Sequence, residues 1–516
     1  MTFISIFNDV LGPVMRGPSS SHTAGSHHIG RIARSLWGDG IPDSAVFTFD
    51  PEGSYSRVYR QQSVDSGLAS GLINMPMSDE GFHRAVDAAA DEGISTRFRI
   101  GSLEEASHPN TVEIRLSSPD REMTAIAASI GGGIVAFSQI DGWHLELDGK
   151  THDLIIICRR GCEDKFHRIL PESDADLSLT THPQRPEEIL LHYRSAREVE
   201  DAITDGLRRH PDVARVMRVA PLFYPRKKAM PFEGSEDMIR SAPDDMRSLG
   251  EIGRFFEARQ LGCPESEINA EMKHRFEVMR KSVNQGLEEK DLNMRLLTPT
   301  ARSVLETEKS GGSAVGGIHL RAAARAMAVM HTANSGGVVC AAPTGGSAGV
   351  LPGVLVSMIE DGSIGFEKAI RSLFAAGAVG MVIAQRATFA AEVAGCQVEI
   401  GAAGAMAAAA VVDAAGGSAK QAADAAAISF QNTMGSVCDL VQGIVEIPCH
   451  TRNAVAASNA FLCADLILGG YVNPISLDET IDAVYSVGKM LPRELRCTAL
   501  GGLAATPSAK AMKRLR

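Results

Sequence analysis

The sequence predicts an α+β N-terminal portion followed by an all-α C-terminal domain. Up to about residue 222, short runs of strand-forming residues alternate with helical patterns. Beyond Gly316 charged residues become sparse, and apolar helical patterns follow one another with glycine between most of them. The chain of 516 residues is too long for one ordinary core, which favours two to four domains.

A first α+β domain is expected at residues 1–150. A polar loop at 17–28 leads into apolar residues that recur at helical spacing between 29 and 36. A further helix is expected at 85–92, and strands are expected at 45–49, 95–100, 111–116 and 124–130. Three glycines at 131–133 break the last of these strands, because glycine readily adopts positive φ.

Residues 151–222 predict a separate βαββαβ unit. Its strands are expected at 154–158, 177–181, 189–193 and 213–219, and its helices at 163–170 and 196–209. This order is ferredoxin-like and resembles an ACT regulatory domain, a kind of unit that typically binds an amino acid at a dimer interface. The glycine-rich turn after the first strand is represented only by Arg160-Gly161-Cys162. The sequence therefore leaves open whether this unit is purely structural or senses an amino acid.

A linker and a helical domain complete the predicted organisation. Residues 223–245 are rich in proline and form the expected linker, and residues 246–516 form the all-α domain. Two outer helices carry charges between their apolar positions, at 246–258 and 265–285. The inner helices are expected at 322–333, 351–360, 366–389, 404–415, 419–433, 453–468 and 477–490.

The charge and cysteine content exclude several classes of protein. A formal net charge of -11 argues against binding to nucleic acid, which needs clustered basic residues. The N-terminus has no basic segment followed by a long apolar core, and no stretch of about twenty residues is free of charge or glycine. We therefore expect a cytoplasmic protein with no membrane partner. The nine cysteines are expected to be reduced thiols.

The polar loop contains four candidate substrate-binding residues, Ser19, Ser20, Ser21 and Thr23. Hydroxyls and backbone N–H groups at the start of a helix bind anions such as carboxylates. A plain helix cap by Thr23 or Ser26 is the alternative. His22, in the middle of the loop, favours the functional interpretation.

Three cysteines of the C-terminal domain are candidate metal ligands: Cys396, Cys438 and Cys449. Their region consists mostly of Ala, Val, Ile and Gly, yet each cysteine has polar or glycine neighbours. A thiolate near a helix N-terminus suits iron. The separations match neither standard ferredoxin pattern, so spacing alone leaves plain buried cysteine open, as we expect for Cys340 and Cys463. Zinc is an alternative metal, but structural zinc sites usually include a pair of ligands close together in the sequence, which is absent here.

Four motifs occur together in this chain: Gly17-Pro18-Ser19-Ser20-Ser21-His22-Thr23, Gly395-Cys396-Gln397, Val437-Cys438-Asp439 and Pro448-Cys449-His450-Thr451-Arg452-Asn453. They resemble the motifs of the iron-sulfur L-serine dehydratases of bacteria. His108-Pro109-Asn110 and the stretches 129–133 and 500–504 also match this family. The resemblance covers nearly the whole chain. Residues 1 to about 220 are similar to the β portion and about 246–516 to the α portion, fused in one polypeptide.

The resemblance implies a [4Fe-4S] cluster held by Cys396, Cys438 and Cys449, with one iron left without a cysteine. Such an open iron acts as a Lewis acid toward the carboxylate and β-hydroxyl of serine. His22 is the implied base for the Cα proton, and loss of hydroxide leads to pyruvate and ammonia. The implied orienting residues are Ser19, Ser20, Ser21, Thr23, Thr344, Arg452 and Asn453. Arg452 suits the substrate carboxylate.

Several positions depart from the family pattern near the expected site. Gln61-Gln62 stands where relatives usually have Gly-His, and Gly345 replaces an asparagine. Gln431-Asn432 replaces a His or Asn ahead of the second cysteine, and Leu440 replaces a proline. Cys497 is either a resting ligand of the fourth iron or a helix-end residue, and we favour the second.

These departures keep other functions open. One alternative is the same elimination on threonine, cysteine or another β-substituted amino acid. Another is an amino-acid-sensing protein without catalysis. A pyridoxal-phosphate enzyme is disfavoured, because no lysine has a suitable loop context and the thiols would go unexplained. A homodimer is expected, because ferredoxin-like units often pair edge to edge.

Overall fold

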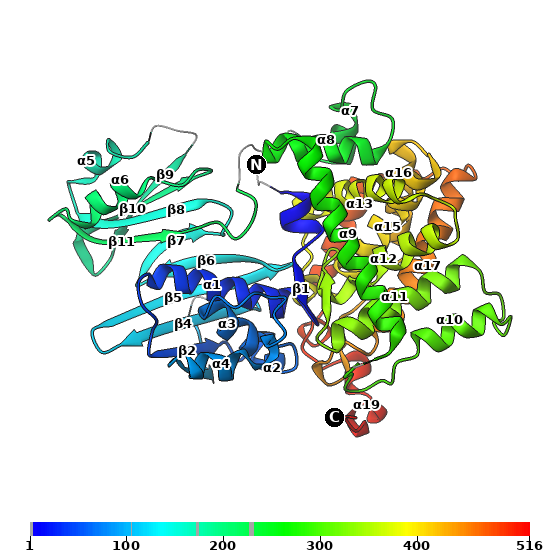
Figure 1. Cartoon of the computed structure of the whole chain (residues 1–516), viewed down its shortest axis with the longest axis horizontal. Coiled ribbons are helices and arrows are strands. Elements are labelled where there is room, and N and C mark those ends of the chain that lie inside the picture. The colour runs from blue at the N-terminus through cyan, green and yellow to red at the C-terminus, as the bar shows by residue number, and fades with distance from the viewer. Residues whose placement is uncertain (1–3, 105, 172–174, 226–231, 291, 516) are drawn as a thin grey trace.

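The computed structural model describes residues 4–104, 106–171, 175–225, 232–290 and 292–515. Two parts that contain β-sheet lie on one side of the molecule, and a helical body lies on the other (Figure 1). The predicted order of a mixed α/β region followed by a helical region is confirmed.

The larger sheet has six strands in the order β3-β2-β4-β5-β6-β7. The strands are β2 (Ser44–Phe49), β3 (Ser95–Ile100), β4 (Thr111–Ser118), β5 (Arg121–Gly131), β6 (Ile134–Ile140) and β7 (Trp143–Leu147). β2 and β3 run parallel, and the other neighbours run antiparallel. The first four strands were predicted, whereas β6 and β7 were not. Gly131, Gly132 and Gly133 all have positive φ and turn the chain from β5 into β6.

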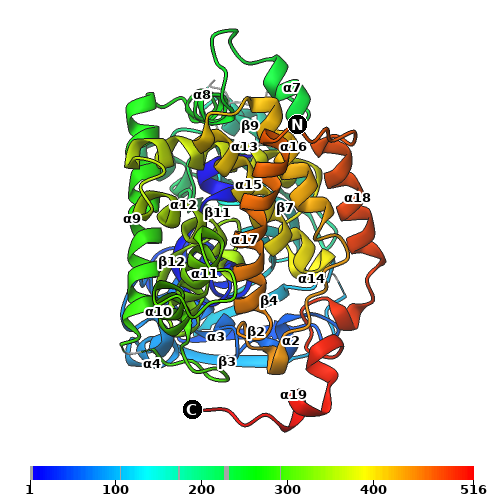
Figure 2. The same ribbon diagram turned by 90° about the vertical axis from the view of Figure 1, so that its right-hand side faces the viewer.

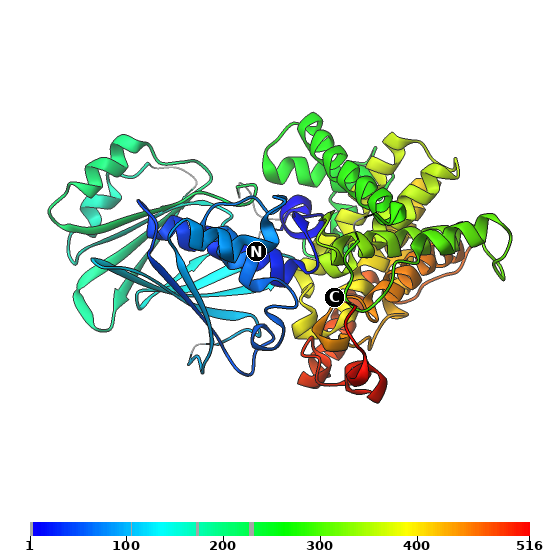
Figure 3. The same ribbon diagram turned by 60° about the horizontal axis from the view of Figure 1, so that its bottom comes forward.

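Four helices accompany this sheet: α1 (Gly25–Trp37), α2 (Tyr55–Val58), α3 (Val64–Leu72) and α4 (Ala85–Asp91). α1 lies over one face of the sheet (Figure 3) and buries the predicted apolar positions, such as Ile29 and Leu36, completely. α3 packs closely on α1, since a Cβ atom at Gly71 would lie 2.2 Å from the backbone oxygen of His27. The loop that precedes α1 is therefore held firmly between the sheet and α3.

The βαββαβ order predicted for the next unit is confirmed. The elements are β8 (His152–Arg159), α5 (Glu163–His167), β9 (Asp176–His182), β10 (Arg185–Ser195), α6 (Asp201–Arg208) and β11 (Val213–Val219). The strands form an antiparallel sheet in the order β11-β8-β10-β9, which is ferredoxin-like. α6 begins later than expected, at Asp201. Binding of an amino acid by this unit stays a prediction.

The helical body follows a short connection, of which residues 226–231 lie outside the described residues. Its helices are α7 (Ser235–Arg240), α8 (Leu249–Leu261), α9 (Glu265–Glu288), α10 (Ala301–Lys309), α11 (Ile318–Asn334), α12 (Val350–Glu360), α13 (Phe366–Arg386), α14 (Ala391–Ala394), α15 (Ile400–Ala415), α16 (Ala419–Gln431), α17 (Cys449–Leu468), α18 (Leu477–Met490) and α19 (Pro507–Ala511). α7 lies within the predicted linker. Every inner helix predicted from the sequence is present.

α15 and α17 lie at the centre of this body, between α9 and α18 (Figure 2). Alanine predominates in α15, and all but its last residue are buried, so neighbouring helices approach it closely. Among the described residues, the segment Cys396–Ala415 is apolar and long enough to cross a membrane. Its most apolar stretch is 89% buried within the protein, as expected for a core helix.

The N-terminal segment packs with the helical body, although the sequence predicted it as part of the first domain. Ile4, Ile6 and Val10 belong to the hydrophobic core that α8, α13 and α15 also form. β1 (Val14–Arg16) pairs antiparallel with β12 (Val338–Cys340). The last residues before the serine-rich loop are thus fixed to the helical body.

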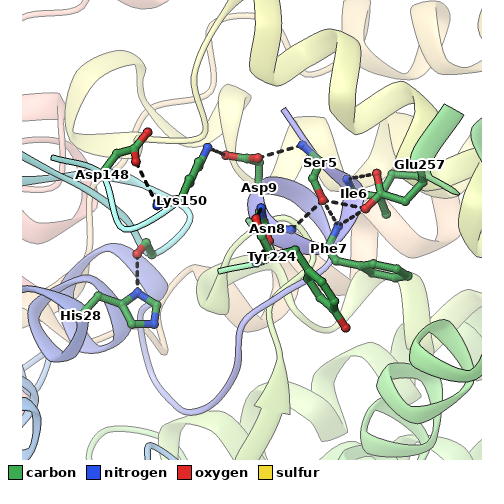
Figure 4. Close-up of polar contacts among 11 residues, drawn as sticks. Ser5, Ile6, Phe7, Asn8, Asp9, His28, Asp148, Lys150, Tyr224 and Glu257 are labelled. Carbon is green, nitrogen blue, oxygen red and sulfur yellow. Dashed lines mark hydrogen bonds and ion pairs between the residues drawn. The ribbon is translucent and has the colours of Figure 1, made fainter. Parts of the chain in front are cut away.

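Buried polar groups secure this segment (Figure 4). The Glu257 carboxylate accepts hydrogen bonds from Ser5 Oγ at 2.6 Å, Ile6 N at 2.8 Å and Phe7 N at 3.1 Å. Asp9 pairs with Lys150 at 2.5 Å, and both side chains are at most 10% exposed. Lys150 follows β7 of the larger sheet, whereas Asp9 lies in the N-terminal segment that packs with the helical body. The ion pair therefore joins the sheet-containing part to the helical body.

Glu257 is expected to make stability depend on pH. Burial raises the pKa of Glu257 to about 7 from an ordinary value of 4.5, against the opposing effect of its three donors and Arg275. The folded state therefore binds more protons than the unfolded state between these values, and the free energy of unfolding should fall as pH rises from about 5 to 7. We expect Glu257→Gln to reduce this slope, measured by urea unfolding.

Glu267→Gln is the matched control for that measurement, because Glu267 is exposed on α9. An unchanged pH slope in Glu257→Gln would contradict the assignment of the slope to Glu257.

Candidate functional site

The serine-rich loop forms a wide helical turn at Ser20–Ala24, and α1 continues from it. His22 is 1% exposed within this turn. Its Nδ1 lies 3.0 Å from Ser21 Oγ and 3.2 Å from Ser19 Oγ, and its Nε2 lies 3.0 Å from Ser54 Oγ. Burial, reinforced by His108, lowers the pKa of His22 to about 3. The imidazole is therefore neutral at physiological pH.

The hydroxyls of the other two candidate residues, Ser20 and Thr23, contact neighbouring backbone. Thr23 Oγ1 donates to the backbone oxygen of Gln62 at 2.9 Å. Ser20 Oγ accepts from the backbone N–H of Gly345 at 3.1 Å. Ser20 thus joins the N-terminal loop to the loop that carries Thr344, as expected for parts of one site.

The loop at Thr344 is tied to a second buried carboxylate. Thr344 Oγ1 donates to Glu399 Oε1 at 2.5 Å. A Cβ atom at Gly346 would lie 2.5 Å from the same oxygen, and one at Gly345 would lie 2.9 Å from the backbone nitrogen of Ser20. The asparagine side chain usual at position 345 therefore has no space in this arrangement.

The three predicted cysteines come from three different segments and are all buried, free thiols. Cys396 opens a short helical turn, Cys438 lies in a loop, and Cys449 is the first residue of α17. Hydrogen bonding to the Cys396 and Cys497 thiols, together with burial, raises the pKa of Cys438 well above its ordinary value. Burial, Cys396 and Glu399 raise the pKa of Cys449.

Cys497 belongs to this thiol group, although the sequence favoured a simple helix-end residue. Its backbone N–H donates to the backbone oxygen of Cys438 at 3.0 Å, and the N–H of Cys438 donates to Leu495 at 2.9 Å. A short backbone bridge thus places Cys497 beside Cys438. Cys438 and Cys497 lie far apart in the sequence, so the sequence did not indicate that they are neighbours.

Arg452 and Asn453 hold the loops that carry the cysteines. Arg452 donates to the backbone oxygen of Val437 at 2.7 Å and pairs with Asp439 at 3.0 Å. Asn453 Nδ2 donates to the backbone oxygens of Gly346 and Cys449 at 2.8 and 2.9 Å. The contacts of both residues with a substrate stay a prediction.

The chemistry of the thiol group suits an iron-sulfur cluster. Within the described residues, no three His, Cys, Asp or Glu side chains surround one point as ligands of a single metal ion. Thiolates are nevertheless the standard ligands of iron-sulfur clusters, which contain several metal ions. The proximity of the cysteines to one another favours their protonated thiol form. Bound metal cations would instead stabilise the thiolate form. The donor set therefore fits the implied cluster.

A cavity of about 300 Å³ adjoins this thiol group. Cys396 and Arg452 line it together with polar side chains on or next to α16 and α17, among them Ser429, Asn432 and Asn459. The cavity is large enough for a small polar molecule.

Two buried carboxyl groups of the site, Glu392 and Glu399, were not assigned a role from the sequence. Glu392 accepts a hydrogen bond from Asn110 Nδ2 at 2.5 Å, and burial raises the pKa of its carboxyl group to about 8. Glu399 bonds Thr344 and lies near Arg452. Glu392 lies shortly before Cys396 and Glu399 shortly after it, and each is a single acidic residue among mostly apolar neighbours. An isolated acidic residue in an apolar stretch is the sequence signal that could have identified them. The contact to Asn110 also explains one of the family-like motifs.

The departures from the family pattern lie at different distances from the thiols. Gln62 is 1% exposed, and its Nε2 lies 3.8 Å from Cys497 Sγ. Gln431 Nε2 instead donates to Thr480 on α18 at 3.1 Å. Gln62 is thus part of the site, whereas Gln431 joins two helices.

Comparisons with known proteins give a consistent result. The model of the family described as serine dehydratase alpha chain matches residues 157–504. A probable L-serine dehydratase alpha chain of Bacillus subtilis is 42% identical over 283 residues, which are 55% of this chain and 94% of the relative. The probable beta chain of the same organism is 32% identical over 228 residues, 43% of this chain and 100% of that relative. An L-serine dehydratase of Streptomyces coelicolor is 32% identical over 288 residues, 53% of this chain and 61% of the relative.

Proposed function

Because the chain belongs to the serine dehydratase family, with α-like and β-like portions in one polypeptide, we propose that it eliminates water from L-serine to give pyruvate and ammonia. In this proposal Cys396, Cys438 and Cys449 hold a [4Fe-4S] cluster. The observation that carries the proposal is the convergence of buried free thiols with the loop of His22: Ser54 bonds both His22 and the backbone of Cys497.

When bound, the cluster supplies a Lewis-acidic iron for substrate oxygens. The protein residues provide the remaining functions. His22 is neutral and removes the Cα proton. Ser19, Ser20, Ser21, Thr23, Thr344, Arg452 and Asn453 orient the substrate or hold the loops around it. Cys497 is a candidate fourth thiolate in the enzyme without substrate.

A related substrate is the second candidate. Gln62 places a neutral amide beside Cys497 where relatives usually have histidine, and Gly345 removes a polar side chain beside Ser20. Both changes alter groups that would contact the β-substituent or carboxylate. The alternative is the same elimination on threonine, cysteine or another β-substituted amino acid.

The βαββαβ unit is proposed as an ACT-like module that binds an amino acid in a homodimer. A cavity of about 280 Å³ between this unit and α1 supports a zwitterionic ligand, because Arg34, Arg218 and Glu198 line it with charges of both signs. The protein is proposed to be cytoplasmic.

An assay of anaerobically purified protein tests the function. We expect bound iron and sulfide, and pyruvate formation from L-serine with kcat/KM at least about tenfold above that for L-threonine or L-cysteine, a difference of about 1.4 kcal/mol in transition-state binding. Preferred turnover of another amino acid would support the second candidate. Protein that holds no iron under these conditions would contradict both.

A further inference from the structure

Glu392 on α14 is a buried acidic residue without a basic partner. It is 2% exposed, and within the described ranges no Lys, Arg or His side chain forms an ion pair with it. Two other buried acids are compensated, since Asp9 pairs with Lys150 and Asp439 pairs with Arg452. Removing an ionised carboxylate from water is unfavourable unless a cation compensates its charge. Glu392 is therefore suited to receive a cation from outside the described chain.

The side chain of Asn110 places an acceptor without a donor beside Glu392. Its Nδ2 donates to Glu392 Oε1 at 2.5 Å. The reverse orientation of the amide would bring two acceptor oxygens together, so this contact fixes which amide atom is the nitrogen. The remaining atom, Oδ1, is buried and has no hydrogen-bond partner among the residues that the structure describes. Because buried amide oxygens usually accept a hydrogen bond, Oδ1 indicates a donor that the described chain does not supply.

The loop that carries Asn110 is tied to the His22 turn. The backbone oxygen of Pro109 accepts a hydrogen bond from the backbone N–H of Ser54 at 2.8 Å. Ser54 Oγ lies 3.0 Å from His22 Nε2 and donates to the backbone oxygen of Cys497 at 3.0 Å. The neighbours of Asn110 thus reach both the proposed base and the thiol group.

Glu392 is fixed to the thiol group and to the larger sheet. It precedes the cluster ligand Cys396 by four positions (392 to 396). A Cβ atom at Gly131 would lie 3.0 Å from the backbone nitrogen of Ala390, so the end of β5 packs against the residue before α14. The carboxyl group therefore lies where the sheet-containing part meets the segment that leads to the thiols.

We propose that Asn110 and Glu392 bind the α-ammonium group of the amino-acid substrate. This inference rests on the proposed elimination and assigns the partner of the amino end of the substrate. An ammonium group has three N–H donors and one positive charge, which match the Asn110 oxygen and the Glu392 carboxylate. Arg452 is the partner for the substrate carboxylate, so the two charged ends of the zwitterion have separate partners. Serine, threonine and cysteine share the ammonium group, and the site serves each of them.

The electrostatic surroundings of Glu392 agree with this assignment. Burial raises the pKa of Glu392 to about 8, and Glu399 acts in the same direction. A bound ammonium group would oppose both effects, because a nearby positive charge favours the ionised carboxylate. A ligand without an amino group would leave Glu392 uncompensated and the Asn110 oxygen without a donor. Such a site discriminates strongly against analogues that lack the group it binds.

Steady-state kinetics with L-serine and 3-hydroxypropionate test the site, because 3-hydroxypropionate is serine without its amino group. Glu392→Gln removes the charge and Asn110→Leu removes the acceptor. We expect each variant to raise KM for L-serine by about 10- to 100-fold, the cost of a lost hydrogen bond to a charged group. The inhibition constant of 3-hydroxypropionate should change by less than about twofold. Glu392→Asp keeps the charge and should recover part of the affinity for L-serine.

Calorimetric titration with L-alanine and propionate tests the site without turnover. L-alanine has no β-hydroxyl to eliminate, and propionate is the same molecule without the amino group. Wild-type holoenzyme should bind L-alanine at least about tenfold more tightly than propionate, and Glu392→Gln should abolish this difference. Glu257→Gln is the matched control, because Glu257 is also a buried acid but holds the N-terminal segment. It should preserve the difference, and all variants should keep the wild-type iron content.

The outcomes separate the ammonium site from the proposed reaction. Equal weakening of L-serine and 3-hydroxypropionate by Glu392→Gln would overturn the site, since the residue would then support the fold without recognising the amino group. An unchanged KM for L-serine in both variants would also overturn it and leave the elimination standing. Protein that binds L-alanine in a Glu392-dependent manner, but forms no keto acid from any amino acid assayed, would overturn the reaction while preserving the ammonium site.

Discussion

Cys396→Ser protein is expected to lose the visible absorbance of the iron-sulfur cluster, most of its iron and its activity. A serine hydroxyl is a much weaker ligand for iron than a thiolate, and Cys396 is near enough to Cys438 to raise the pKa of that thiol. Loss of a Lewis acid that contributes several kcal/mol corresponds to a fall in kcat/KM of at least about 10³-fold. Iron analysis, absorbance and pyruvate assays of anaerobic protein measure these effects.

Cys463→Ser is the matched control. Cys463 is also buried on α17, but it lies fourteen positions beyond Cys449 (449 to 463), or about 21 Å along the helix. It should retain iron and activity. A fully active Cys396→Ser enzyme with a normal iron content would refute the ligand assignment.

His22→Gln is expected to retain the cluster but to lose kcat by about 10²–10⁴-fold, the usual contribution of a general base. Glutamine can replace some hydrogen bonds to Ser21 or Ser54, so the loop should stay folded. The effect should lie mainly in kcat, because the residue acts on the Cα proton. Steady-state kinetics and iron content of the same preparation provide the measurement.

His27→Gln distinguishes a chemical role from a structural one. His27 is a buried histidine of α1, just after the turn that contains His22, and its Nδ1 contacts Ser70 at 2.9 Å. If both variants lost iron and activity equally, damage to α1 would explain the result and the assignment of His22 as base would be wrong.

Much of the helical body followed from sequence because its helices repeat apolar residues at regular spacing. α12, for example, begins at Val350 and ends at Glu360, within one residue of the expected bounds. α3 was not predicted, because its glycine- and serine-rich sequence has low helix propensity, and its packing on α1 and α4 stabilises it. β7 has a strict alternation of buried and exposed residues that was available in the sequence but overlooked.

The site was predictable to a lesser degree. The spacing of Cys396, Cys438 and Cys449 did not identify them as ligands, because they lie on separate segments. The family resemblance identified them instead. Glu392 and Cys497 were not assigned because a single residue type carries no information about a partner hundreds of positions away. Glu392 contacts Asn110, and the backbone of Cys497 contacts Ser54, both from the sheet-containing part of the chain.

The packing of Ile4 to Met15 among the C-terminal helices also affects the order of folding. The core that receives this segment includes residues as far along the chain as Cys497, so it cannot be completed until that residue has been synthesised. Contacts between such distant positions require the closure of a very large loop and form slowly. Residues 4–15, which are synthesised before the helices that receive them, therefore wait for their binding site. During synthesis, Ile6 and Val10 would be exposed surface for chaperones.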